Sequence, residues 1–150
     1  MKLALPLAAL ACLSPAVAEA RVSIREHTGK VAQPYAGWAD RSPMRVPTGL
    51  VIVDHDVQAC GTPPPPDIQL EGEITSVEGC TQWLDTPTIH LSPALKGRER
   101  KRVFFHELGH VWDATFNVTQ SLSENVADRY AECSLNAKPR ACKLLARRGA

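Results

Sequence analysis

Net charge is almost absent from this sequence, since 17 lysine and arginine residues face 16 aspartate and glutamate residues for a formal charge of +1. Aromatic residues are also scarce, at 5% of the chain. They are too few to build a base-stacking platform beside the one dense basic run, residues 98–102, which we interpret as the solvated start of a helix or a loop. The composition therefore favours no nucleic acid and no other strongly charged partner.

Long apolar runs are missing after residue 20, where no stretch approaches the roughly 20 apolar residues of a membrane-spanning helix. We therefore expect no membrane span. Residues 1–20 combine Lys2, a short apolar run and small residues that end at Ala20, which is the pattern of a cleavable secretory signal. Cys12 leaves a lipoprotein as the less favoured alternative. Residues 21–150 are predicted to form one domain, secreted or periplasmic, because two domains would each be close to the minimum size for a stable core.

Closely spaced cysteine pairs are absent as well, which argues against a zinc site built from cysteines. An exported domain would keep the four cysteines that follow residue 20 in an oxidising compartment, where disulfides persist. Four cysteines allow three pairings. We expect Cys60–Cys80 and Cys133–Cys142, because this pairing closes the two shortest loops.

The first half of the domain shows the periodicity of strands. Residues 50–53 form a short apolar, β-branched run, while residues 68–77 and 88–91 alternate apolar with polar side chains. We expect a strand at each of these places. The proline-rich stretch 61–67 is expected to be an exposed spacer inside the first disulfide loop.

The second half shows helical periodicity. Apolar side chains recur around the whole helix from residue 102 to about 115, which predicts a largely buried helix. A second helix is predicted from Ser121 to about Asn136, with Pro139 marking its end. The expected fold class is therefore α+β, with a small N-terminal sheet followed by two helices.

The first predicted helix contains the segment His106-Glu107-Leu108-Gly109-His110. His106 and His110 lie one turn apart on one face, so that both imidazoles can reach a single ion. Zinc binds imidazole nitrogen readily, and a catalytic zinc takes three protein ligands and leaves one position for water. Glu107 lies between the histidines, where it can take a proton from that water and later pass it to a leaving amine. Gly109 leaves room for close packing against a second element.

Downstream, the second predicted helix contains the segment Glu124-Asn125-Val126-Ala127-Asp128. The two segments together resemble the zincin metallopeptidases, in particular the gluzincin pattern HExxH followed by ExxxD. The resemblance implies that His106, His110 and Glu124 bind Zn2+. It further implies that Glu107 acts as general base and acid, and that Asp128 orients His106 from behind the metal.

The same resemblance implies a fold and a substrate. It suggests a minimal zincin-like domain with an active-site helix and a glutamate-bearing helix, acting on a peptide or protein. It likens residues 88–91 to the edge strand along which zincins bind extended substrates. The metzincin branch would need a His or Asp at position 116, where this sequence has Phe116, and is excluded.

The third zinc ligand has alternatives. Glu124 follows Ser121 by three residues and could close a capping box at the start of the helix. Asp113 and Asp128 are the competing carboxylates. We favour Glu124 because it shares one helix face with Asp128, so that the two can serve the metal and its surroundings together.

The expected function is peptide-bond hydrolysis by a secreted zinc peptidase. Tyr130, His55 and His90 are candidate donors to the oxyanion that develops during the reaction. One alternative is a secreted binding or structural module whose zinc only joins two helices. Glu107 argues against this alternative, because a purely structural zinc site does not require a non-ligand carboxylate between its two histidines. A zinc hydrolase with a non-peptide substrate is the other alternative, since the motif determines water activation but not the substrate.

Overall fold

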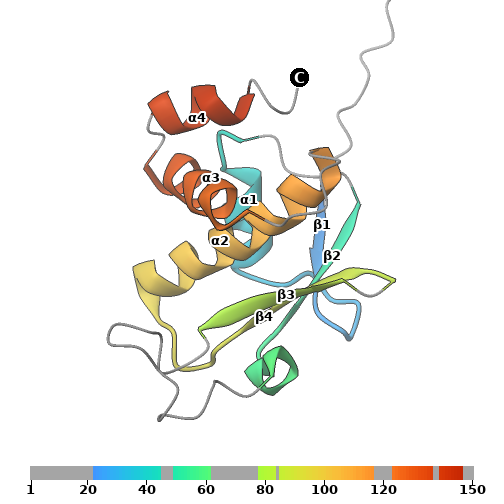
Figure 1. Ribbon diagram of the computed structural model, residues 1–150. Helices are drawn as coiled ribbons and strands as arrows, with labels where there is room; N and C mark the ends of the chain where they lie inside the picture. Colours follow the sequence, from blue (N-terminus) through green and yellow to red (C-terminus); the bar gives the residue numbers. More distant parts are fainter. Residues whose placement is uncertain are drawn as a thin grey trace, which may run out of the picture.

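The computed structural model describes residues 22–44, 49–61, 78–83, 85–116, 123–136 and 139–146. In these parts the chain is a mixed α and β domain (Figure 1) with the elements β1 (Ser23–Arg25), α1 (Tyr35–Asp40), β2 (Leu50–Asp54), the 3-10 helix η1 (Val57–Cys60), β3 (Gly79–Trp83), β4 (Pro87–Leu91), α2 (Gly97–Phe116), α3 (Glu124–Asn136) and α4 (Pro139–Ala146).

Several expectations fall outside the described residues. These are the secretory signal at 1–20, most of the proline-rich spacer, the strand at 68–77 and the helix start at Ser121. Of the other expected elements, the strands at 50–53 and 88–91 are confirmed as parts of β2 and β4.

The four strands lie in the order β1-β2-β4-β3. β1, β2 and β4 are parallel, while β3 is antiparallel to β4 and lies at the end of the strand order. The expectation that residues 88–91 form an edge strand is therefore wrong. They pair with a strand on each side, and Thr88 to Leu91 are all buried, as interior strands are.

The helices differ from expectation mainly at their ends and in number. α2 begins at Gly97, so the basic run 98–102 forms its first turns, which confirms the interpretation of that run as a helix start. α1 and α4 were not expected. The predicted end of the second helix near Asn136 is confirmed, because α3 ends at that residue. Pro139 follows this end and is itself the first residue of α4, a position where its missing N–H group removes no hydrogen bond.

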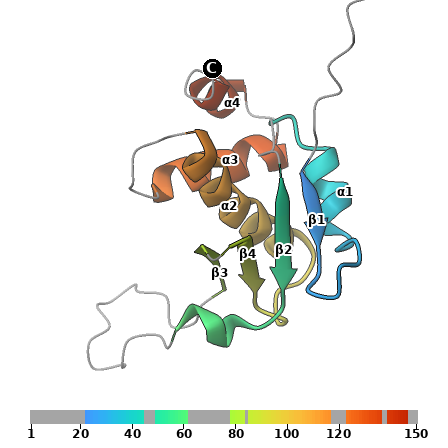
Figure 2. The same cartoon turned by 90° about the vertical axis from the view of Figure 1, so that its right-hand side faces the viewer.

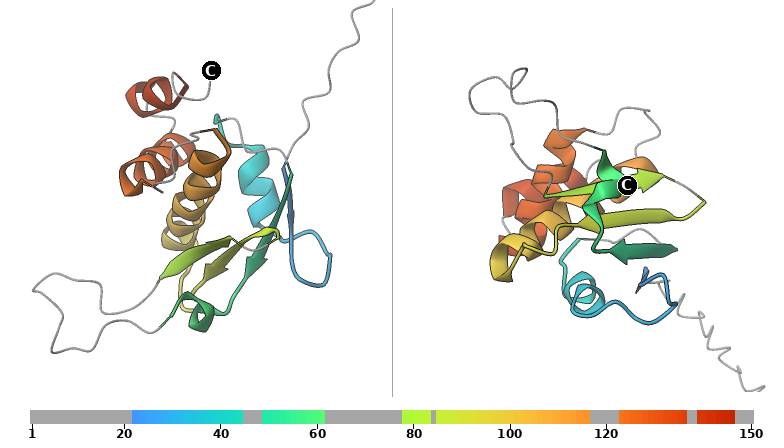
Figure 3. Two further views of the ribbon diagram at one scale, coloured as in Figure 1. Left: turned by 45° about the vertical axis from the view of Figure 1, so that its right-hand side comes forward. Right: turned by 90° about the horizontal axis from the view of Figure 1, so that it is seen from below.

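α2 forms the centre of the domain, between the sheet and α3 (Figures 2 and 3). Phe104, Phe105, Leu108 and Trp112 are fully buried, as the apolar pattern around this helix predicts. Although α2 spans 20 residues, no helix in the described parts of the chain is both long and apolar enough to cross a membrane.

Gly109 of α2 lies close to the backbone of α3. A Cβ atom at this position would be 2.8 Å from the Cα of Ala127 and 2.9 Å from the Cβ of Tyr130. Any larger side chain would collide with α3, so the expected role of Gly109 in close packing is confirmed.

Both expected disulfides are present. Cys60–Cys80 joins η1 to β3, and Cys133–Cys142 joins α3 to α4, with S–S distances of 2.01 and 1.99 Å. The pairing predicted from loop length is confirmed.

Candidate metal centre

Two histidines of α2 face the first turns of α3. The ring centroids of His106 and His110 are 4.9 Å apart, and their side chains are 17% and 9% exposed. The apolar side chains of α2 are buried against the sheet and α3, which prevents the helix from rotating about its axis. The core therefore determines the direction in which both imidazoles point.

Glu124, the first residue of α3, contacts both histidines. Its Oε2 atom is 3.1 Å from Nε2 of His106, and its Oε1 atom is 3.5 Å from Nε2 of His110. Tetrahedral zinc ligands at bond lengths of roughly 2.0–2.1 Å lie about 3.4 Å from one another. One donor atom from each of the three residues lies within 4.8 Å of the others, and no other such group occurs in the described parts of the chain. The donor set and its spacing fit a zinc-sized ion.

Asp128 contacts His106 from the side away from Glu124. Its Oδ1 atom is 2.9 Å from Nδ1 of His106. A proton on Nδ1 would donate to this carboxylate and leave the lone pair of Nε2 available to a metal ion. This is the placement that the gluzincin resemblance implies for Asp128.

The competing interpretations of the third ligand fit the structure less well. Asp113 is only 1% exposed, and its Oδ2 atom accepts a hydrogen bond from the backbone N–H of Ser123, immediately before α3, at 3.1 Å. Asp113 thus stabilises the start of α3 and is not part of the donor group. A capping box would place Glu124 one turn inside the helix, whereas α3 begins at Glu124 itself.

Glu107 is 5% exposed and lies on the sheet side of α2. The hydroxyl group of Thr81, on β3, lies 2.9 Å from Oε2 of Glu107 and 3.1 Å from its backbone oxygen. Burial raises the pKa of Glu107 above its ordinary value, while the Thr81 hydrogen bond and the charge of His106 act in the opposite direction. A carboxylate with a raised pKa is a better proton acceptor near neutral pH.

Thr81 was missed by the sequence analysis. The segment 79–83 was not expected to be a strand, and nothing in its residues indicates which element its side chains contact. The sequence offers one weak indication of a strand here, because Thr81 is β-branched and follows Cys80, whose expected disulfide partner lies 20 positions away.

Burial also affects His110. It lowers the pKa of His110 below the ordinary value, although the nearby carboxylate of Glu124 opposes this shift. A neutral imidazole is the form that binds a metal ion. The site therefore favours the ligand state of His110.

The three candidate oxyanion donors have their contacts elsewhere. Tyr130 is fully buried between α2 and α3, with its ring 6.1 Å from that of Trp112. His55 follows β2 and packs against Tyr35 at 5.8 Å. His90 lies beside Asp54 on the opposite face of the sheet from Thr81, because successive residues of a strand alternate between faces.

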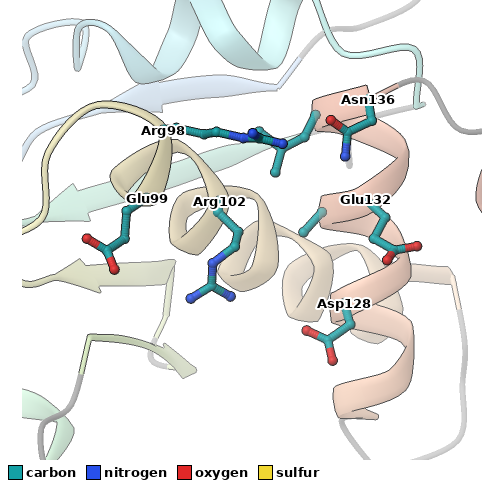
Figure 4. A pocket seen from close by; sticks show the side chains of 8 residues that line it. Arg98, Glu99, Arg102, Asp128, Glu132 and Asn136 are labelled. Atoms are coloured by element: carbon teal, nitrogen blue, oxygen red, sulfur yellow. The ribbon is translucent and has the colours of Figure 1, made fainter.

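An open groove lies between α2 and α3 (Figure 4), and His106, His110 and Glu124 do not line it. Asp128 connects the groove with the centre, since it lines the groove and contacts His106. Arg102, from the groove's other wall, forms an ion pair with Glu78 at 2.9 Å. The lining carries charges of both signs, from Arg98, Glu99, Arg102, Asp128 and Glu132, together with Ala131, Leu135 and Asn136.

Comparison of the chain with protein-family models, curated proteins and solved structures found no match.

Proposed function

We propose that this protein is an exported zinc-dependent peptidase. Zn2+ would be held by His106, His110 and Glu124, with Asp128 orienting His106. The observation that carries the proposal is Glu107, a buried carboxylate that belongs to the same helix turn as both histidines but not to the donor group.

Bound there, zinc would polarise the substrate carbonyl and lower the pKa of the attacking water. Glu107 would take one proton from that water as its oxygen attacks the carbonyl carbon. When the C–N bond breaks, the same carboxyl group would return the proton to the leaving amine, so that acid, amine and carboxylate balance. The low exposure of Glu107 keeps bulk water from competing for this proton.

Export is supported by two further observations. The two disulfides fit an oxidising compartment. The pattern of a secretory signal at residues 1–20 agrees with this, and its cleavage remains part of the proposal. Peptide as the substrate follows from the gluzincin resemblance.

A structural zinc clip is the second candidate function. The donor group joins α2 to α3 where the two helices cross, so that an ion there would also tie them together. Zinc content alone does not separate a clip from an enzyme.

The substitution Glu107→Gln separates the two. We expect it to keep zinc and the melting temperature while lowering peptidase activity by about 10²–10⁴-fold or more, because one carboxylate serves as both base and acid. His110→Ala is the control and should lose zinc and activity together. Both variants would be assayed on an unstructured casein-like substrate, with metal content measured on the same samples. A wild type that binds zinc but cleaves no peptide would favour the clip.

A further inference from the structure

We infer that Thr81 on β3 is a positioning residue for Glu107, an inference that rests on the proposed peptidase function. The hydroxyl oxygen of Thr81 lies 2.9 Å from Oε2 of Glu107. Among the described residues, Thr81 is the side chain that donates a hydrogen bond to the Glu107 carboxylate. The hydrogen bond uses one lone pair of Oε2 and sets the orientation of the carboxylate, while both lone pairs of Oε1 stay available to accept a proton from water.

The direction of the Thr81 side chain follows from the register of the sheet. Thr81 is paired with Ile89 of β4, and both side chains point to the face covered by α2. Its neighbours Cys80 and Gln82 point to the other face, where each is attached to η1. Cys80 forms the disulfide with Cys60, and the Gln82 side chain donates a hydrogen bond to the backbone oxygen of Ala59.

β3 is therefore held from two sides although it lies at the end of the strand order. The ladder with β4 fixes its register, and the two attachments to η1 fix its opposite face. A hydroxyl group on such a restrained strand holds its partner more accurately than one on a loop. The Glu107 side chain is buried, but its last torsion, which turns the carboxylate plane, has a broad range, and without the hydroxyl group nothing from β3 would hold that plane in one orientation.

The inference predicts a specific kinetic effect. Thr81→Val keeps the β-branched shape and replaces the hydroxyl group by a methyl group. We expect kcat to fall roughly 10- to 100-fold, the usual range when a group that orients a metal-site residue is removed. KM and zinc content should stay close to the wild-type values, because Thr81 touches neither the donor group nor the groove. Thr81→Ser should restore most of the activity.

Thr88→Val is the matched control. Thr88 lies in the neighbouring strand β4, is buried and donates its hydroxyl hydrogen bond to the backbone oxygen of Thr86 at 3.3 Å. The same chemical change is made there without contact to Glu107, so kcat should remain at the wild-type level. If Thr81→Val does not fold, Thr81→Ala takes its place.

A double-mutant cycle tests whether Thr81 acts through Glu107. In the Glu107→Gln background, Thr81→Val should cost little further activity, because the carboxylate that it positions is already gone. Equal losses in both backgrounds would overturn the inference, as would a Thr81→Val variant with a lowered melting temperature and unchanged kcat. Failure of the proposed function is distinguishable, since it shows in the wild type alone, which would then bind zinc and cleave no peptide.

Discussion

The two walls of the candidate centre are built in different ways. On the wall formed by α2 and β3, Glu107 and His110 are almost fully buried and lie against the core. On the wall formed by α3, the side chains of Glu124 and Asp128 are 75% and 65% exposed. The first wall is thus positioned by packing before any ion binds, whereas the two carboxylates of the second wall contact the histidines from exposed positions on α3.

The two walls therefore depend on different parts of the chain. Buried side chains cannot change rotamer without disturbing their neighbours, so the α2 wall should be stable in the metal-free protein. Exposed carboxylates gain little from contacts in water, so the α3 wall should depend on the ion and on the α2–α3 crossing. Changes to one wall, to the other or to the helix crossing that joins them should therefore have different effects.

The largest effect is expected from Glu124→Ala on the exposed wall. Zinc affinity should fall by at least about 100-fold, because loss of a ligand exceeds the 10–100-fold cost of losing an outer partner. The free energy of unfolding of the metal-free variant should lie within about 0.5 kcal/mol of the wild-type value, since an exposed side chain contributes little to stability. Glu132→Ala, an exposed glutamate further along the same helix, is the control and should keep zinc. Equal zinc affinity in Glu124→Ala would reassign the third ligand.

Removal of the disulfides should separate stability from activity. Replacing either pair by alanine is expected to lower the free energy of unfolding by about 3 kcal/mol, given the lengths of the closed loops. Only the Cys60–Cys80 pair is attached to β3, next to Thr81, so only its loss should also lower kcat of the folded protein. Chemical denaturation and kinetics at a temperature where both variants are folded would test this. Equal kcat values in the two variants would contradict it.

The helix crossing that joins the two walls is tested by Gly109→Ala. Overpacking against α3 costs about 1–3 kcal/mol, and the better helix propensity of alanine returns about 1 kcal/mol. The nearest atoms belong largely to the backbone of Ala127, which cannot turn aside, so we expect a net loss of about 1–2 kcal/mol together with weaker zinc binding.

Gly37→Ala provides the contrast for this substitution. Gly37 lies in α1, and a Cβ atom there would be 3.4 Å from the end of the flexible Arg41 side chain. The melting temperature of Gly37→Ala should therefore be equal to or higher than that of the wild type. A Gly109→Ala variant as stable as Gly37→Ala would show that the two helices can move apart without cost.

The smallest effect concerns the acid stability of the metal-free protein. Burial lowers the pKa of His110, so below the ordinary histidine pKa the unfolded state binds more protons than the folded state. Stability should therefore fall as the pH drops below about 6.5, and this dependence should be shallower in His110→Asn. Urea denaturation between pH 5 and 7 in the presence of a chelator would measure it. Identical pH dependence in both proteins would contradict the buried, neutral state of His110.

Local sequence patterns predicted the secondary structure around the site and the disulfide pairing. The spacing of His106 and His110, the buried face of α2 and the close packing at Gly109 follow from the geometry of a single helix. The strands β2 and β4 follow from short apolar runs, and the disulfide pairing follows from loop length. Each of these depends on residues that are near in sequence, which is why a linear pattern contains the information.

The arrangement around that helix was decided by tertiary structure. Strand order places β3 at the end of the sheet and β4 inside it, and only this order brings Thr81 to Glu107. The sequence favoured Glu124 as the third ligand and left Asp113 as an alternative, and the fold shows the Asp113 carboxylate accepting a hydrogen bond from a backbone N–H group at the start of α3. Strand order and helix crossing depend on contacts between distant segments, and no periodicity in the sequence specifies them.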